Sequence, residues 1–126
     1  MAQHQTTTLR PVAGPVLTKA IIRAADQLGL TGKVLAAVIG VSEATVSRMR
    51  HGEVGLEPGS KHFELGVLFV RLFRSLDAIV GGDGKVAASW LVNPNVALDG
   101  KPIEKLQTVS GLIDVIAYLD ARRALV

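Results

Sequence analysis

The stretch TGKVLAAVIGVSEATVSRMRHG, Thr31–Gly52, decides the fold of this sequence. Its apolar spacing and its glycines predict two short helices, over 32–39 and 43–51, joined by a tight turn. Gly40 falls in that turn, where a residue that tolerates positive φ is needed. A hydroxyl residue precedes each helix and is expected to cap it by accepting a hydrogen bond from a free backbone N–H. These two N-caps are Thr31 and Ser42.

The residues inside the two helices are typical of a helix-turn-helix. Ala36 is small where the helices cross, and Val46 is placed to pack back under the first helix. The remaining core positions are Leu35, Ile39, Val41 and Met49. An αα-hairpin with the same turn chemistry and no role in DNA binding is the structural alternative.

The outward face of the second helix carries the side chains that a major-groove reader needs. Short polar residues at its start let the backbone approach the base edges, and arginine pairs with guanine or with phosphate. The candidate DNA-binding residues are Ser42, Glu43, Thr45, Ser47, Arg48 and Arg50.

Helical spacing also dominates the rest of the chain. Residues 1–14 show no periodicity and are expected to form a flexible arm, followed by a helix over 15–28. Ser60 can cap a long helix that ends at Val80 and is apolar nearly all round, so it must be buried against its own chain or a partner. Further helical segments are predicted over 85–91 and 95–98, from Pro102, and from 109 onwards. The sequence therefore predicts an all-α protein.

Composition excludes several classes of function. The 126 residues include no cysteine, which excludes a disulfide scaffold, a cysteine-ligated zinc site and a cysteine nucleophile. Aromatic residues make up only 4%, too few for the stacking platforms that bind single-stranded nucleic acid. The net charge of +3 is too small to identify a nucleic-acid binder by itself, but the excess lies in the half that holds the helix-turn-helix.

The most apolar run, 65–76, is interrupted by Arg71 and Arg74 and is too short to cross a bilayer. No targeting segment is visible at the start of the chain, so we expect a cytoplasmic protein that does not associate with membranes.

No pattern of residues predicts catalysis, a metal or a cofactor. His4, His51 and His62 are not spaced as metal ligands with a carboxylate partner. Gly84-Lys85 lacks the flanking residues of a phosphate-binding loop, and the serines have no His/Asp context. We therefore expect a protein that is not an enzyme.

The second half contains the stretch WLVNPNVALDGKPIEKLQTVSG, residues 90–111. Taken alone it predicts a packed helical corner, anchored by Trp90 and shaped by Pro94 and Gly100. This stretch resembles the toxin-binding domain of the Xre/MbcA/ParS antitoxins. Residues 16–52 resemble the Xre-type helix-turn-helix that precedes that domain, so the resemblance covers most of the chain after residue 14.

The resemblance implies a partner and a mode of inhibition. Members neutralise a toxin encoded beside them, typically a RES-domain enzyme that degrades NAD or a related ADP-ribosyltransferase, by covering its NAD-binding cleft. Members often dimerise and repress their own operon, so operator DNA and a homodimer within a larger hetero-oligomer are implied as well. The candidate toxin-binding residues are Trp90, Asn93, Asn95, Lys101, Arg122 and Arg123. The two arginines either enter the toxin's cleft or merely complement the negative end of the last helix.

These inferences predict a helix-turn-helix N-terminal domain over 15–80, including a long dimerisation helix, and a small helical toxin-binding domain over 81–126. Leu68 and Phe69 are the expected dimer contacts on the long helix. Two alternatives remain at this point. The first is a stand-alone transcriptional regulator whose second half only dimerises. The second is an adaptor with a helix-turn-helix fold and no role in DNA binding.

Overall fold

The computed structural model describes the backbone of residues 2–125 and the side chains of residues 13–125. This part of the chain forms helices and no strand, which confirms the all-α prediction. Within it, no helix is both long enough and apolar enough to cross a membrane. The helices are α1 (Ala2–Gln27), α2 (Gly32–Ile39), α3 (Glu43–Arg50), α4 (Lys61–Ile79), α5 (Gly84–Val92), α6 (Pro102–Lys105) and α7 (Val109–Arg123).

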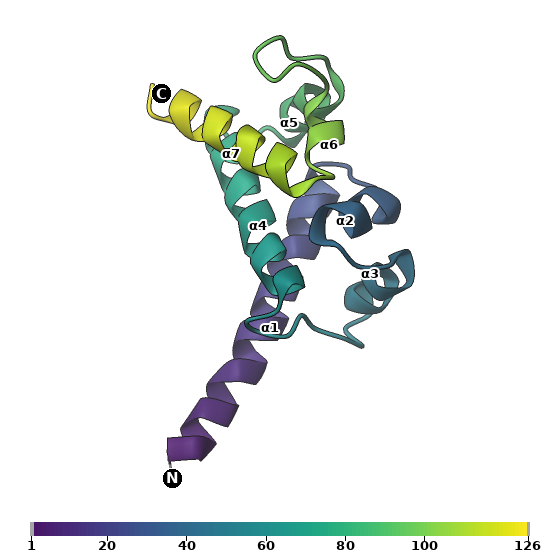
Figure 1. The fold of residues 1–126 in the computed structure, drawn as a ribbon, viewed down its shortest axis with the longest axis vertical. Helices are drawn as coiled ribbons and strands as arrows, with labels where there is room; N and C mark the ends of the chain where they lie inside the picture. Colours follow the sequence, from purple (N-terminus) through teal and green to yellow (C-terminus); the bar gives the residue numbers. More distant parts are fainter. Residues whose placement is uncertain (1, 126) are drawn as a thin grey trace.

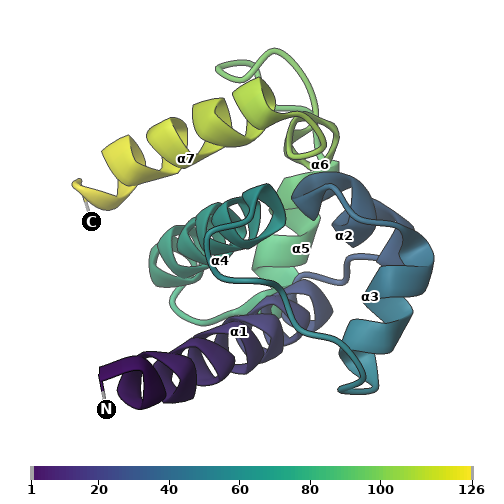
Figure 2. The same ribbon diagram turned by 60° about the horizontal axis from the view of Figure 1, so that its bottom comes forward.

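Helix α4 lies between α1 and α7 and packs against both (Figures 1 and 2). The helix-turn-helix, α2 and α3, packs beside α1 and the start of α4, whereas α5 and α6 connect the far end of α4 to α7. Since α4 has neighbours on two sides, much of its wide apolar surface is buried within the chain. Its fully buried side chains include Phe69, Leu72 and Leu76.

This packing corrects the expectation for Phe69. Its side chain is 0% exposed and belongs to the core of a single chain, so it is not available to a second copy. Leu68 is partly buried against the same core. The position of α4 between α1 and α7 accounts for its buried apolar residues, whereas Val67 on the same helix stays 46% exposed.

The local stop and start signals of the helices act as predicted. The hydroxyls of Thr31, Ser42, Ser60 and Thr108 each accept a hydrogen bond from the backbone N–H three residues later. Gly40 ends α2 with φ 76°, the left-handed conformation that its turn requires. These signals depend only on neighbouring residues, which is why the sequence reveals them.

Helix α1 begins at Ala2 rather than at Pro15, so the helix predicted over 15–28 also includes residues 2–14. Residues 2–14, expected to be an arm without helical order, have a helical backbone; Met1 lies outside the described residues. Residues 2–10 contain no glycine or proline, whereas Pro11, Gly14 and Pro15 lie inside the helix. Proline within a helix removes a backbone hydrogen bond and its ring crowds the carbonyl four residues earlier, which is why the sequence predicted a helix start at Pro15. The extension projects away from the rest of the chain (Figure 1).

A loop passes close to α1 at Gly14. A Cβ atom at this position would lie 2.7 Å from the carbonyl oxygen of Leu56, so only glycine permits the approach. One turn further on, the buried Thr18 hydroxyl donates to the Gly14 carbonyl at 2.8 Å and accepts from the Leu56 N–H at 3.2 Å. These contacts fix the segment between α3 and α4 onto α1.

Residues 96–99 form a turn, with bonds from the Leu98 N–H to the Asn95 carbonyl and from the Asp99 N–H to the Val96 carbonyl, both at 3.2 Å, but no helix continues from it. Asn95 and Gly100 pair through two backbone hydrogen bonds, of 2.9 and 3.2 Å, and close a tight loop. The Asn95 side-chain oxygen also accepts from the N–H of Leu98, whose side chain is buried, and Asp99 adopts φ 56°. Bonds between the two ends of the loop outweigh the local helical spacing.

Candidate functional site

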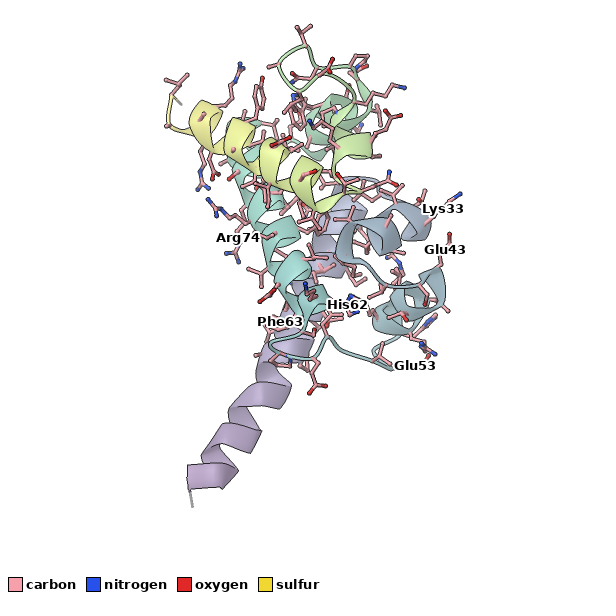
Figure 3. The ribbon with its side chains drawn as sticks, viewed as in Figure 1. Lys33, Glu43, Glu53, His62, Phe63 and Arg74 are labelled. Carbon is pink, nitrogen blue, oxygen red and sulfur yellow. The ribbon has the colours of Figure 1, made fainter. Side chains whose placement is uncertain are left out.

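Helix α3 presents a polar face to solvent and an apolar face to the core. Val46 and Met49 are buried, whereas Glu43, Ser47 and Arg48 are exposed. This confirms the predicted orientation of the second helix within the helix-turn-helix. Glu43 and Lys33, at the starts of α3 and α2, lie along the outer side of this unit (Figure 3).

A short chain of hydrogen bonds orders the side chains at the start of α3. The Ser42 hydroxyl caps the helix through the Thr45 N–H, and the two hydroxyls lie 2.9 Å apart. Arg48 Nη2 in turn donates to the Thr45 hydroxyl at 3.3 Å. Ser42 and Thr45 are thus occupied in holding the helix, and Thr45 guides the Arg48 guanidinium along the exposed face.

Arg50 forms an ion pair, whereas Arg48 forms none with the described side chains. Its Nη1 lies 2.7 Å from Asp26 Oδ1 near the end of α1, and this ion pair joins α3 to α1. The carboxylate offsets the positive charge of Arg50. Both arginines were expected to bind DNA, but of these two only Arg48 has no carboxylate partner among the side chains of residues 13–125.

The candidate partner-binding residues gather around an aromatic pair. The rings of Trp90 on α5 and Tyr118 on α7 stack, with centroids 6.1 Å apart and planes 16° apart. The Arg122 guanidinium lies over the Tyr118 ring, with its Cζ 5.7 Å from the ring centroid. Trp90 and Arg122, 32 positions apart in the sequence, therefore belong to one surface.

Tyr118 is the residue that the sequence analysis missed. It is the single tyrosine of the chain and precedes Arg122 by four residues, a spacing that places the two side chains together on a helix. That spacing was a usable signal for the Tyr118–Arg122 contact. Nothing local indicates the contact with Trp90, because it depends on how α5 and α7 pack.

Trp90 is only half-buried, whereas the adjacent Leu91 is 0% exposed. The anchor of this corner is thus Leu91, and Trp90 covers the core while keeping part of its ring at the surface. A partly buried tryptophan whose ring reaches the surface is a residue type enriched in protein interfaces.

The two terminal arginines point to different places. Arg122 lies over Tyr118, whereas Arg123 Nη1 donates to the Ser75 hydroxyl on α4 at 3.4 Å. Both are exposed, but they flank α7 on different sides and do not form one basic pair. Both lie in the last turn of α7, near the negative end of the helix dipole, and each also makes the contact just described.

The other candidate residues of this half differ in their roles. Asn93 follows the last residue of α5, and its Nδ2 donates to the Ser89 carbonyl at 2.8 Å. The Asn95 side-chain oxygen accepts from the Leu98 N–H inside the loop that follows. Lys101 is exposed and directly precedes α6 without a side-chain capping bond. The loop also displays Val96, 99% exposed, which the sequence analysis did not single out.

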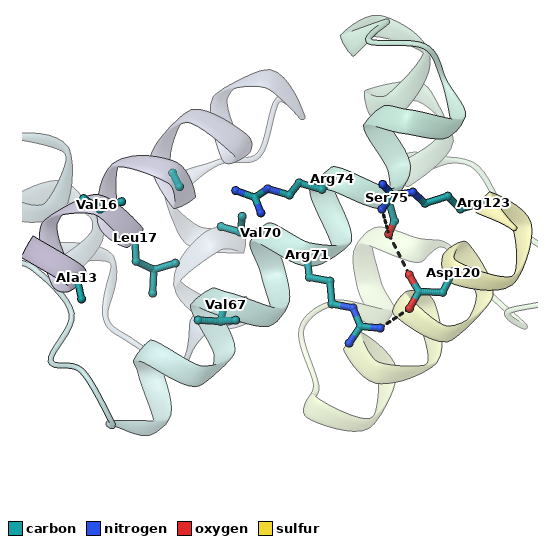
Figure 4. A pocket seen from close by; sticks show the side chains of 11 residues that line it. Ala13, Val16, Leu17, Val67, Val70, Arg71, Arg74, Ser75, Asp120 and Arg123 are labelled. Carbon is teal, nitrogen blue, oxygen red and sulfur yellow. Dashed lines mark hydrogen bonds and ion pairs between the residues drawn. The ribbon is translucent and has the colours of Figure 1, made fainter. Parts of the chain in front are cut away.

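A polar cluster joins α4 to α7 (Figure 4). The buried Ser75 hydroxyl, 1% exposed, donates to Asp120 Oδ1 at 3.0 Å. The other oxygen of Asp120 accepts from Arg71 at 2.5 Å. The cluster therefore links the long helix of the first half to the last helix of the second.

Among the residues that the structure describes, no three histidine or carboxylate side chains are grouped as a metal site. The predicted binding residues lie on two surfaces, the outer face of α3 and the surface around Trp90, Tyr118 and Arg122.

Two family models match the chain. Residues 8–71 match the antitoxin Xre-like helix-turn-helix domain, and residues 75–124 match the antitoxin Xre/MbcA/ParS C-terminal toxin-binding domain. No curated protein matches the sequence significantly. The two matched segments meet within α4, the helix that packs against elements of both. Their identity and order are those that the sequence resemblance implied.

Proposed function

Because the chain belongs to the Xre/MbcA/ParS antitoxins, we propose that it inhibits an NAD-using toxin of the RES type and represses its own operon. It is an antitoxin of a toxin–antitoxin system, and both of its matched domains are binding modules rather than enzymes. The observation that carries the proposal is the presence of a DNA-reading fold and a toxin-binding fold on one shared helix, α4.

The surface around Trp90, Tyr118 and Arg122 supports binding of the toxin. It combines a partly buried indole that reaches the surface with the exposed guanidinium of Arg122, held over the Tyr118 ring. Aromatic residues and arginine dominate the energetics of protein interfaces. Beyond it, Leu125 is 85% exposed and continues the chain past α7. We propose that this end of α7 covers the NAD-binding cleft, where Arg122 pairs with acidic side chains of the toxin.

The outer face of α3 supports binding of operator DNA. Arg48 is exposed, ordered through Thr45 and not neutralised by a carboxylate among the described side chains, so it is available to a guanine or a phosphate. We propose a palindromic operator bound by two copies of α3, hence a homodimer. Since Phe69 is buried inside one chain, that dimer must use another surface.

The first experiment is co-expression of the chain with the product of the adjacent reading frame. A stable complex with a small NAD-using enzyme, together with salt-dependent binding to the promoter fragment, supports the proposal. Promoter binding without any such complex would favour the stand-alone regulator. Complex formation without promoter binding would remove autorepression from the account.

A further inference from the structure

A groove of about 700 Å³ lies between α1, α4 and α7 (Figure 4). At one end, Val16 and Leu17 of α1 face Val67 and Val70 of α4. Val16 is 61% exposed and Val67 is 46% exposed, although both side chains are apolar. This end of the groove therefore keeps apolar surface in contact with water.

The other end of the groove is basic. It is lined by Arg71, Arg74 and Arg123, together with Ser75 and Asp120. The Asp120 carboxylate already binds Arg71 and Ser75, so its charge is committed. Within residues 13–125, neither Arg74 nor Arg123 has a carboxylate partner. Among the described side chains, Arg74 thus has no acidic partner, and Arg123 is held only by the Ser75 hydroxyl, at the end of the groove away from the exposed valines (Figure 4).

These features together define the chemistry of an occupant. A ligand that covers the valines and pairs with the arginines must be apolar on one side and acidic on the other. A second copy docked through the same groove would offer these arginines no free carboxylate from the groove lining, because its one acidic side chain, Asp120, is already bound to Arg71 and Ser75. DNA would leave the valines uncovered, and Arg74 lies on the side of the molecule away from Lys33 and Glu43 (Figure 3).

We infer that this groove seats an acidic, amphipathic segment of the toxin, an inference that rests on the proposed function. Ser75, Asp120 and Arg123 belong to the segment that matches the toxin-binding domain, so the groove continues that domain's surface. Val16 and Val67 belong to the segment that matches the helix-turn-helix domain. The toxin then contacts both domains and leaves α3 free for DNA.

The test measures the Kd between purified toxin, the product of the adjacent reading frame, and single variants of the full chain. Arg74→Glu replaces attraction by repulsion, and Val67→Asp places a charge in the apolar end. Each is expected to raise the Kd at least about tenfold, the effect of an interface residue that matters. Because both side chains are exposed, the variants should melt like the unchanged protein.

Matched controls make the same kinds of charge change away from the groove. Lys33→Glu reverses an exposed charge on α2, and Ala37→Asp adds a carboxylate to the exposed face of the same helix. Both should leave the Kd unchanged. The inference is supported if only the groove variants bind the toxin weakly. Added salt should then reduce the difference in Kd between Arg74→Glu and the unchanged chain, because salt screens the charges.

Three outcomes overturn the inference, and they differ in what else they remove. If the unchanged chain binds the toxin and both groove variants bind equally well, the groove is not the seat, but the proposed function stands. If the unchanged chain does not bind the toxin, the proposed function fails as well. If the free chain sediments as a dimer and Val67→Asp releases monomers, the groove is an interface between copies.

Discussion

Tyr118 stacks on Trp90 with ring centroids 6.1 Å apart, and this contact joins α5 to α7 at the surface of the toxin-binding domain. Stacked aromatic pairs contribute about 0.5–1.5 kcal/mol beyond the area that they bury. We therefore expect two roles for the pair, which experiments can separate: stabilising the domain and, in the proposed function, presenting Trp90 and Arg122 to the toxin.

A double-mutant cycle measures the first role. Trp90→Ala and Tyr118→Ala should each lower the free energy of unfolding, and their effects should be non-additive by about 0.5–1.5 kcal/mol. Tyr118→Phe keeps the ring and should retain the coupling with Trp90. Urea unfolding followed by circular dichroism provides the values; strictly additive losses would show that the rings do not stabilise each other.

Arg48 and Arg50 should differ in their effects on DNA binding. Arg48→Ala should weaken promoter binding by about 1–3 kcal/mol if it reads a guanine with two hydrogen bonds. Arg50→Ala should cost less affinity, because Arg50 is paired with Asp26 at 2.7 Å. Fluorescence anisotropy with a labelled promoter fragment at one fixed salt concentration compares them. Equal losses, or a larger loss for Arg50→Ala, would contradict the assigned roles.

Asp120 should stabilise the contact between α4 and α7 mainly through Ser75. Asp120→Ala removes the acceptor of a buried hydroxyl, which costs about 1–3 kcal/mol when the donor is left unsatisfied. The Arg71 pair is exposed and should add little. Asp120→Asn keeps an oxygen acceptor for Ser75 and should therefore lose much less stability in the same urea titration. Similar losses for both variants would assign the effect to charge.

Gly111 should be the least replaceable residue of the last corner. A Cβ there would lie 2.1 Å from the Lys105 carbonyl oxygen, so the backbone of α6 must shift to admit alanine. Overpacking of this kind costs about 1–3 kcal/mol or more. Gly32→Ala is the matched control, since its Cβ would meet only the Val46 side chain at 3.8 Å. Thermal melts of the two variants should differ clearly, and a Gly111→Ala protein as stable as the control would disprove the steric argument.

The sequence predicted what local chemistry determines. The caps at Thr31, Ser42, Ser60 and Thr108, and the turn at Gly40, each depend on residues within one helical turn. The helix-turn-helix followed from these signals and from its apolar spacing. The family was identified from one further stretch, residues 90–111, and the matched models confirm it.

What the sequence did not predict depends on contacts between distant segments. The separation of Arg122 from Arg123 follows from the rotation of α7 against α4 and α5. The burial of Phe69 follows from α4 having a helix on either side. The turn that begins at Asn95 is closed into a loop, because Asn95 and Gly100 bond to each other across it. No pattern along one segment contains this information.

The central claim is that this chain inhibits an NAD-using toxin, and NAD turnover by the purified toxin tests it most directly. The toxin, taken as the product of the adjacent reading frame, is titrated with the full chain while NAD consumption is followed. We predict that turnover falls to background once the chain saturates the toxin. Unchanged turnover at saturating chain, with the complex verified by sedimentation, would contradict the account.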